Sequence, residues 1–302
     1  MQVITKTLDK LIDIPNNHFV FDIETTGLNS KYCKVILIGI LYNFENKTII
    51  KQYFASSEED EKELLLSFVK DINNFDYHIS FNGISFDIPF LNSRFKKHEI
   101  DFYIDKSKDI DILRIVKPHK EKLSLSDCKL KTLERYIGIQ REDTISGKES
   151  VKLYKEFTLN KDPFIKEKIL LHNYEDIYYL AKLLKINYIL DEKLDYINIS
   201  VNNLDYKILI SKYKLSKSKL NLIFTSNFDF NLDINIFNEN YSIRSSGATL
   251  YIDIDIDYAV DNNNNKIYFY HLGKAIPLKV NDNFINDNIL ALSKYILSKE
   301  FK

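Results

Sequence analysis

The chain has 302 residues, of which 45% are hydrophobic and 28% charged, with a formal net charge of -1 at pH 7, so it can form two modest domains but has no basic field for tight, sequence-specific duplex binding. Only two cysteines occur, far apart, which excludes a zinc ribbon and favours the reducing cytoplasm. No run of about twenty apolar residues and no signal-peptide core occurs, so we expect neither membrane spanning nor secretion.

The first elements predicted along the chain are three strands. They cover residues 19–23, 35–42 and 48–54, and turn-prone residues separate them, which favours an antiparallel meander. After residue 56 the pattern changes to a serine cap, an acidic first turn and apolar residues at helical spacing. A helix that ends near Ile72 therefore follows the meander.

Short strands and helices alternate through the rest of the first half. A strand, a helix and another strand are predicted over residues 77–81, 86–97 and 102–104. Short helices with basic content follow over residues 106–157, and a longer helix covers about 163–190. This order suits an α/β domain over residues 1–190, in which helices flank a mixed sheet.

The second half of the chain has a different texture from about residue 191. Strands are predicted over residues 207–213, 220–224, 228–236, 250–260 and 266–272. Apolar residues over 284–297 have the spacing of a closing helix. We therefore expect a smaller, β-rich C-terminal domain over residues 191–302, to which the sequence assigns no chemistry.

Two carboxylates, those of Asp22 and Glu24, lie at the end of the first predicted strand. Because successive strand side chains point to opposite faces, Asp22 and Glu24 project together while Phe21 and Ile23 pack the other way. Two like charges in a largely buried strand cost several kcal/mol unless a cation neutralises them. The pair indicates a divalent metal site, although solvated acids would also explain an isolated Asp-x-Glu.

Two more acidic positions lie on predicted helices. Asp87 falls in the first turn of the helix over 86–97, where the helix N-terminus alone would favour an acid. His172 and Asp176 are four residues apart in the predicted long helix, so they share one face. A surface ion pair would explain these two alone, but apolar residues around them indicate a helix that packs on the sheet.

In this order the motifs resemble those of the DnaQ-like DEDD exonucleases of the ribonuclease H superfamily, whose metal ligands come as Asp-x-Glu, Asp, and a final Asp preceded by His or Tyr. The resemblance is closest to the YprB-like branch and covers about residues 15–185. The His172 to Asp176 spacing departs from the histidine subclass, which typically has one residue more. Beyond the first motif, the resemblance rests on Asn82-Gly83-x-x-Phe86-Asp87-x-Pro89-Phe90-Leu91, Leu130-Lys131-Thr132-Leu133-Glu134, Gly138-Ile139-x-Arg141-x-Asp143-x-Ile145-x-Gly147 and His172-Asn173-x-x-Asp176.

The resemblance implies a two-metal site. Asp22, Glu24 and Asp176 would hold one divalent cation, and Asp22 would also touch a second one supported by Asp87. Mg²⁺ or Mn²⁺ ions about 3.5–4 Å apart suit such oxygen ligands. His172 would orient or deprotonate the attacking water, or else act as a structural partner of Asp176. In similar enzymes the terminal nucleotide lies along positions that match Thr25, Thr26, Gly27, Leu28, Asn82 and Phe86.

We therefore expect a metal-dependent 3′–5′ exonuclease, a hydrolase that cuts phosphodiester bonds at the 3′ ends of single-stranded DNA or RNA. The alternative is a nucleic-acid or protein binding module that keeps the nuclease-like scaffold and acts through residues 191–302, because a scaffold does not prove a reaction.

Overall fold

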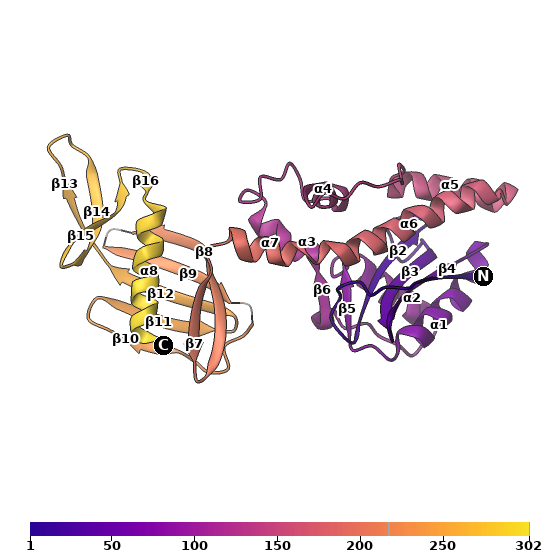
Figure 1. Cartoon of the computed structure of the whole chain (residues 1–302), viewed down its shortest axis with the longest axis horizontal. Helices are drawn as coiled ribbons and strands as arrows, with labels where there is room; N and C mark the ends of the chain where they lie inside the picture. Colours follow the sequence, from indigo (N-terminus) through magenta and orange to yellow (C-terminus); the bar gives the residue numbers. More distant parts are fainter. Residues whose placement is uncertain (217, 227, 302) are drawn as a thin grey trace. The chain divides into compact units, whose positions relative to one another are not determined.

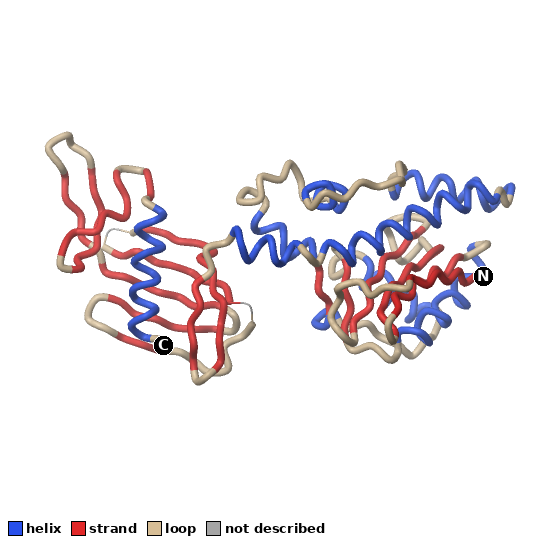
Figure 2. The backbone as a smooth tube through the Cα atoms, viewed as in Figure 1, coloured by secondary structure: helices blue, strands red, loops and turns tan. Residues whose placement is uncertain are grey.

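The structure, a computed structural model, describes residues 1–216, 218–226 and 228–301. The chain divides into two compact units, Met1–Leu190 and Asp191–Lys302 (Figure 1). The first unit combines a mixed sheet with helices, whereas the second consists mainly of strands, drawn in red in Figure 2. This architecture confirms the predicted fold class. Among the described residues, no helix is both long and apolar enough to cross a membrane.

The sheet of the first unit has the strand order β1-β4-β3-β2-β5-β6. Strands β1 to β4 pair in an antiparallel manner, whereas β5 runs parallel to β2 and β6 runs parallel to β5. The predicted meander is therefore correct, and the parallel strands extend it on one side. The strands are β1 (Gln2–Leu8), β2 (His18–Thr25), β3 (Val35–Phe44), β4 (Lys47–Phe54), β5 (Tyr77–Ser80) and β6 (Asp109–Asp111).

Helices cover both faces of this sheet (Figure 1). Apolar side chains of α1 and α2 pack on one face, and those of α5 and α6 pack on the other. The α-helices are α1 (Glu61–Ile72), α2 (Asp87–Lys97), α3 (Ile112–Val116), α4 (Leu130–Tyr136), α5 (Gly147–Asn160), α6 (Pro163–Leu183) and α7 (Ile186–Lys193). Single 3₁₀ turns are η1 (Glu58–Asp60), η2 (Lys106–Lys108) and η3 (Lys117–His119).

The two faces of β2 receive different side chains. Phe19, Phe21 and Ile23 belong to the core beneath α1 and α2. Strand alternation places the intervening residues, Asp22 and Glu24, on the face that α5 and α6 cover. The central strand therefore delivers two carboxylates to the buried surface between the sheet and α6.

Several sequence expectations for the first unit are wrong. Residues 102–104 form no strand, because the side chain of Asn92 takes the place of a strand partner: its Nδ2 donates to Ile104 O at 2.9 Å, and Ile104 N donates to its Oδ1 at 2.9 Å. The strand that pairs with β5 is instead β6. The predicted helix over 163–190 breaks between α6 and α7. Strand β1 was missed because its side chains are mostly exposed.

The described residues of the second unit form two sheets and one long helix. Their strand orders are β10-β11-β12-β9-β8-β7 and β13-β14-β15-β16, and α8 (Asn286–Glu300) packs apolar residues against both. The strands are β7 (Ile197–Val201), β8 (Leu204–Leu215), β9 (Lys219–Ser226), β10 (Asn235–Phe237), β11 (Tyr241–Ser246), β12 (Thr249–Asp255), β13 (Asp257–Val260), β14 (Lys266–Leu272), β15 (Lys274–Val280) and β16 (Asn283–Phe284).

Two predicted strands of this unit are corrected. The run over 250–260 forms two strands in different sheets, because β12 pairs with β9 whereas β13 pairs with β14. The alternation of apolar and polar residues continues across the break, so the sequence pattern resembles one strand. Of the run over 228–236 only the last residues are in a strand. Phe230 and Ile234 are buried at the even spacing typical of a strand. Their backbone N–H groups, however, donate to Gly247 O at 3.0 Å and to the side-chain Oγ of Ser245 at 2.8 Å, which is not a regular strand ladder. Strands β7, β11, β15 and β16 were not predicted.

Candidate active site

A close contact between α6 and the sheet fixes the position of Asp22. Asn173 of α6 is fully buried, and its Nδ2 donates to Asp22 Oδ2 at 3.0 Å, while its Oδ1 accepts from Gln52 Nε2 at 3.0 Å. Gly39 lies opposite Asp22 in β3, and a Cβ atom there would lie 2.2 Å from Asn173 Oδ1. The glycine in an otherwise apolar strand thus makes room for the amide that orients Asp22.

Asp87 reaches the same region from the start of α2. Its side chain is 6% exposed, and its Oδ1 accepts from Ile23 N at 3.3 Å, so the carboxylate lies against β2. The turn before α2 is held by buried Asp111, which accepts from Asn82 N at 2.9 Å and from Ile84 N at 3.3 Å. Asn82 has a φ of 66°, in the left-handed region that asparagine tolerates better than most residues. The Asn-Gly turn therefore aims Asp87 at the strand.

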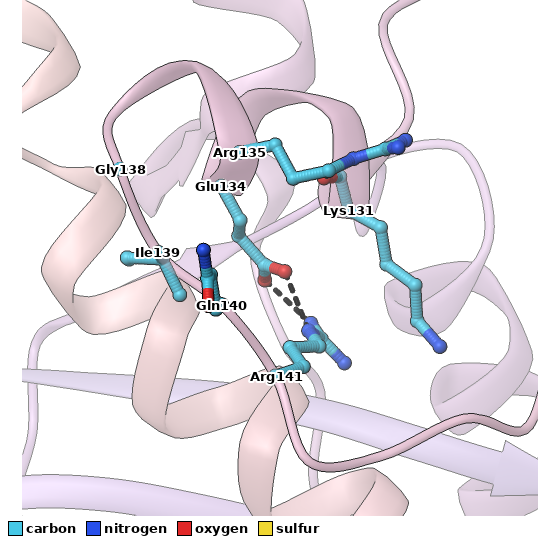
Figure 3. Close-up of a pocket in the computed structure, with 7 residues that line it drawn as sticks. All are labelled: Lys131, Glu134, Arg135, Gly138, Ile139, Gln140 and Arg141. Carbon is cyan, nitrogen blue, oxygen red and sulfur yellow. Dashed lines mark hydrogen bonds and ion pairs between the residues drawn. The ribbon is translucent and has the colours of Figure 1, made fainter.

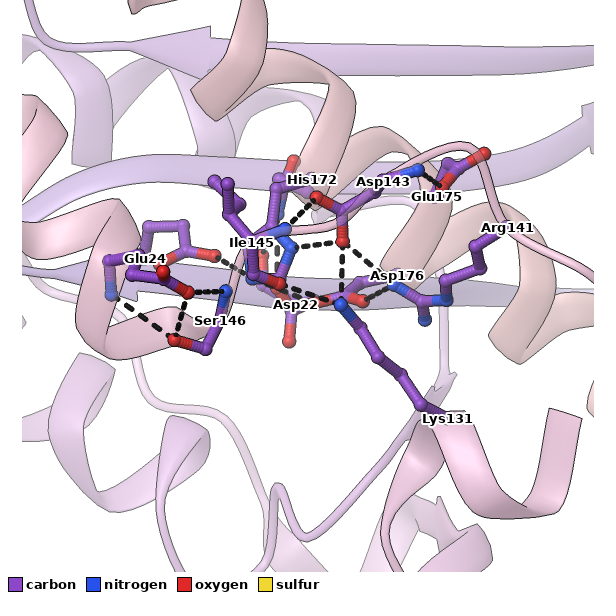
Figure 4. A network of polar contacts seen from close by, with 12 residues as sticks. Asp22, Glu24, Lys131, Arg141, Asp143, Ile145, Ser146, His172, Glu175 and Asp176 are labelled. Carbon is purple, nitrogen blue, oxygen red and sulfur yellow. Dashed lines mark hydrogen bonds and ion pairs between the residues drawn. The ribbon is translucent and has the colours of Figure 1, made fainter. Parts of the chain in front are cut away.

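The α6 residues complete the cluster, which Figure 4 shows. His172 Nε2 lies 3.5 Å from Glu24 Oε1 and 3.7 Å from Asp176 Oδ2. One ligand atom from each of these three residues lies within 4.8 Å of the others. The structure therefore brings together the carboxylates and the imidazole that the sequence picked out from β2 and the long helix.

A segment between α4 and α5 folds over this face of α6, and sequence reasoning missed its part in the site. His172 Nδ1 and Asp143 Oδ2 are 2.8 Å apart, and Arg141 Nη1 donates to Asp176 Oδ1. Glu175 anchors the segment, because its Oε2 accepts from Asp143 N at 2.8 Å. His172 and Asp176, the two α6 side chains that face Glu24, thus each contact a residue of this segment, as the dashed lines in Figure 4 show.

The signal for this segment was present in the sequence. Arg141 and Asp143 belong to one of the runs on which the YprB-like resemblance rests, and Asn173 lies between the two α6 motif residues. Their contacts could not be read from spacing, since each partner is about thirty or more residues away along the chain.

Burial and nearby negative charges raise the pKa values of several carboxyl groups in the site. Burial raises the pKa of Asp22 well above its usual range, and the charges of Asp176, Asp87 and Glu24 raise it further. Burial also raises the pKa of Glu24 to about 7, although the charge of His172 opposes this shift. The pKa of Asp87 is raised to about 7, mainly by burial, against the hydrogen bonds from backbone N–H groups.

The pKa of the His172 imidazole is also raised, but by the neighbouring charges and not by burial. Burial alone would lower the pKa of His172, but the neighbouring carboxylates of Asp176, Glu24 and Asp143 outweigh it, and the pKa lies above its usual value. Without another cation, a proton on His172 is therefore stabilised by the surrounding negative charge.

These residues fit a divalent metal ion. The donor set is dominated by carboxylate oxygens, the ligands that Mg²⁺ and Mn²⁺ prefer in proteins, and the His172 imidazole lies beside them. Burial and neighbouring negative charges raise the pKa values of Asp22, Glu24 and Asp87, and a bound cation would relieve this unfavourable environment. The structure thus contains a candidate acidic metal site made by β2, α2 and α6.

The residues expected along the terminal nucleotide lie near the ends of β2 and β5. Buried Thr25 donates its hydroxyl to Gly27 O at 2.8 Å, and Thr26 Oγ1 accepts from Lys34 N at 3.0 Å, so both hydroxyls close the turn. Leu28 is 86% exposed, whereas Phe86 is partly buried with its ring 5.6 Å from that of Phe90. Their contact with a nucleotide stays a prediction.

Known proteins are similar in sequence to part of this chain. The chain is 28% identical over 176 residues to the "Uncharacterized protein YprB" of Bacillus subtilis, covering 56% of this chain and 41% of YprB. It is 32% identical over 138 residues to the "DNA polymerase III PolC-type" of Ureaplasma parvum serovar 3, covering 37% of this chain and 9% of that protein. The chain therefore spans less than half the length of either relative.

One solved structure and one family model also align with part of this chain. The family B DNA polymerase from the hyperthermophilic archaeon Pyrobaculum calidifontis aligns with 57% of this chain and 24% of its own, at 16% identity and a TM-score of 0.44. The model described as RNase_H superfamily (RNase_H_2) matches residues 19–188, more than half of the chain. With the match to YprB, it confirms the resemblance drawn from the motifs. The chain therefore belongs to the RNase H superfamily.

Proposed function

We propose that the protein is a metal-dependent 3′–5′ exonuclease that hydrolyses phosphodiester bonds of single-stranded DNA or RNA. The observation that carries this proposal is the convergence of Glu24, His172 and Asp176 within 4.8 Å, beside half-buried Asp22 and buried Asp87. Membership of the RNase H superfamily and the match to a PolC-type polymerase support a nuclease.

In the proposed reaction, Asp22, Glu24 and Asp176 would hold Mg²⁺ or Mn²⁺, and Asp87 would support a second ion. When bound, such a pair of ions activates a water molecule and stabilises the leaving oxygen. His172 Nε2 faces Glu24 and Asp176, so the imidazole can hold a proton or a water molecule at the carboxylates. Thr25 to Leu28, with Asn82 and Phe86, would lie along the terminal nucleotide.

The direct test of the proposed function uses short single-stranded DNA and RNA oligonucleotides labelled at the 5′ end, incubated with the whole protein and Mn²⁺. A 3′–5′ exonuclease produces a ladder of labelled fragments that shorten one nucleotide at a time, and EDTA stops it. A labelled mononucleotide released first would reverse the proposed polarity. Intact oligonucleotides under all conditions would overturn the nuclease and leave a binding role.

Metal affinity should depend on pH. Metal binding needs ionised carboxylates, and the pKa values of Glu24 and Asp87 are both about 7. Between about pH 8 and about pH 6, we expect Mn²⁺ affinity to fall about tenfold for each proton that the metal displaces. Conversely, these raised pKa values stabilise the metal-free fold at low pH, and that stability is lost as pH rises through about 7.

Calorimetric titration with Mn²⁺ across this pH range measures the effect, and the rise in Tm that Mn²⁺ causes provides a second readout. Asp13→Asn removes an exposed acid from the same unit and should keep the parent profile. Equal affinities at the two ends of the range would contradict the raised carboxyl pKa values.

The contact between Asp143 and His172 predicts a tautomer effect. A carboxylate only accepts hydrogen bonds, so Asp143 keeps the proton of a neutral His172 on Nδ1 and leaves Nε2 free as an acceptor. In Asp143→Asn, the new amide can donate to Nδ1 and force the proton onto Nε2. We expect the cleavage rate to fall about 10–100-fold, the range typical of partners that orient metal-site histidines.

Cleavage rate and oligonucleotide affinity should both be measured for this variant. Asp143→Glu keeps an acceptor and should recover much of the rate, whereas affinity should change little in either variant. A rate for Asp143→Asn that equals the parent rate, or a Glu variant as slow as the Asn variant, would contradict the orienting role.

A further inference from the structure

A pocket of about 660 Å³ opens beside the candidate metal site. It is lined by residues of α4 and the turn that follows, as Figure 3 shows: Lys131, Glu134, Arg135, Gly138, Ile139, Gln140 and Arg141. Arg141 connects the pocket with the carboxylates, because the guanidinium that forms its wall also donates to Asp176. A group bound in this pocket would therefore lie next to the proposed metal ions.

The guanidinium of Arg141 has more N–H donors than its hydrogen bonds to the described residues use. Its side chain is 6% exposed, and Glu134 accepts from Nε and from Nη2, both at 2.5 Å. With the bond from Nη1 to Asp176, these contacts use three of the five N–H donors of a guanidinium. The other two donors, one on each Nη atom, make no hydrogen bond to the described residues, although Nη1 also lies 3.7 Å from Asp143 Oδ2 as an ion pair. A buried donor without a partner is costly, so this edge is suited to a ligand.

The charge of the pocket indicates which ligand. Three of its lining side chains are basic and one is acidic, and the acid, Glu134, is already neutralised by Arg141. Lys131 Nζ donates to Asp143 Oδ2 at 2.8 Å and to Ile145 O at 2.6 Å, which fixes a second cation at the rim. Arg135 is exposed, and its Nε donates to Lys131 O at 3.1 Å. Fixed cations with a free guanidinium edge match the oxygens of a phosphate.

We propose that this pocket binds a backbone phosphate of the nucleic-acid strand, with Arg141 as its direct ligand and Lys131 and Arg135 at the rim. The proposal rests on the proposed nuclease function and assigns phosphate binding to motif residues whose role the resemblance left open. Glu134 and Asp176 hold the guanidinium of Arg141 in place through three of its donors. The remaining N–H group on each Nη atom is left for the phosphate.

Binding without cleavage tests the pocket. A fluorescein-labelled single-stranded oligonucleotide is titrated with the whole protein in Ca²⁺, an oxygen-seeking ion, and strand integrity is checked on a gel. Arg135→Gln changes an exposed side chain and should fold normally; we expect at least about threefold weaker binding and a salt slope smaller by about 0.7, the value for one contact to a single strand. The double variant Glu134→Gln/Arg141→Gln replaces both members of the buried pair, and we expect about tenfold weaker binding.

Arg114→Gln provides the matched control, since Arg114 is exposed in the same unit and does not line the pocket. Weaker binding and a smaller salt slope in the pocket variants alone support the proposal, even if the parent cuts no strand and the nuclease function fails. Pocket variants that keep the parent affinity and slope while circular dichroism shows them folded overturn it, even if cleavage is confirmed. A parent that binds no oligonucleotide also overturns it.

Discussion

Replacing Asp22 by Asn should abolish cleavage while making the metal-free protein more stable. The amide keeps the shape of the side chain and can still bond to Asn173, but it removes the negative charge that faces Glu24, Asp87 and Asp176. Losing a partner that only orients a metal ligand costs about 10–100-fold, so losing a proposed ligand should cost more than about a hundredfold in rate. The proposed nuclease depends on this result.

The stability gain follows from the same charge. Burial and three neighbouring carboxylates raise the pKa of Asp22, so its ionisation at neutral pH opposes folding unless a cation is bound. We expect the Tm of Asp22→Asn in EDTA near pH 8 to lie above that of the parent, and the increase caused by Mn²⁺ to be smaller.

Two assays on the same samples check these effects, oligonucleotide cleavage in Mn²⁺ and thermal unfolding in EDTA. Asp13→Asn, an exposed acid of the same unit, should match the parent in both. An Asp22→Asn variant that cleaves like the parent would rule out the nuclease. One that is inactive but less stable in EDTA would show that Asp22 acts through the fold rather than through a cation.

The central strand was predictable because its information is local. Alternation along β2 was enough to place Phe21 and Ile23 in one core and Asp22 with Glu24 on the other face, and the structure agrees. The helical spacing of His172 and Asp176 was equally informative, since both face the sheet from α6. These patterns are set by backbone geometry, which the sequence carries directly.

The residues behind the site could not be predicted in the same way. Arg141 lies in a stretch rich in lysine and arginine, and such stretches are usually solvated; only the folding of this segment onto α6 pairs it with Glu134 and Asp176. Gly39 is a similar case, because nothing in the strand explains it until Asn173 is placed against it. Both contacts depend on tertiary packing between distant segments, for which a single sequence has no local signal.

The β-rich unit shows another limit of local patterns. Ile252, Ile254 and Ile256 alternate as expected and are all buried, yet the pattern does not reveal that the chain leaves one sheet and enters another between Asp255 and Asp257. Alternation reports which face is buried, whereas the choice of neighbouring strand depends on the whole unit.

Breaking the buried ion pair between α1 and α2 should strongly destabilise the first unit. Arg94 of α2 and Glu61 of α1 are each 1% exposed and are joined by bonds of 2.7 and 2.5 Å, while Glu61 also accepts from Val35 N at 2.8 Å. Arg94→Met leaves that carboxylate buried without its main cation, and we expect a loss of about 3–5 kcal/mol in the free energy of unfolding. Urea denaturation followed by circular dichroism measures this loss.

The control variant is Lys47→Met, which breaks an exposed pair with Asp9 and should cost less than about 1 kcal/mol in the free energy of unfolding. Equal losses of unfolding free energy in the two variants would contradict the larger cost expected for breaking the buried pair.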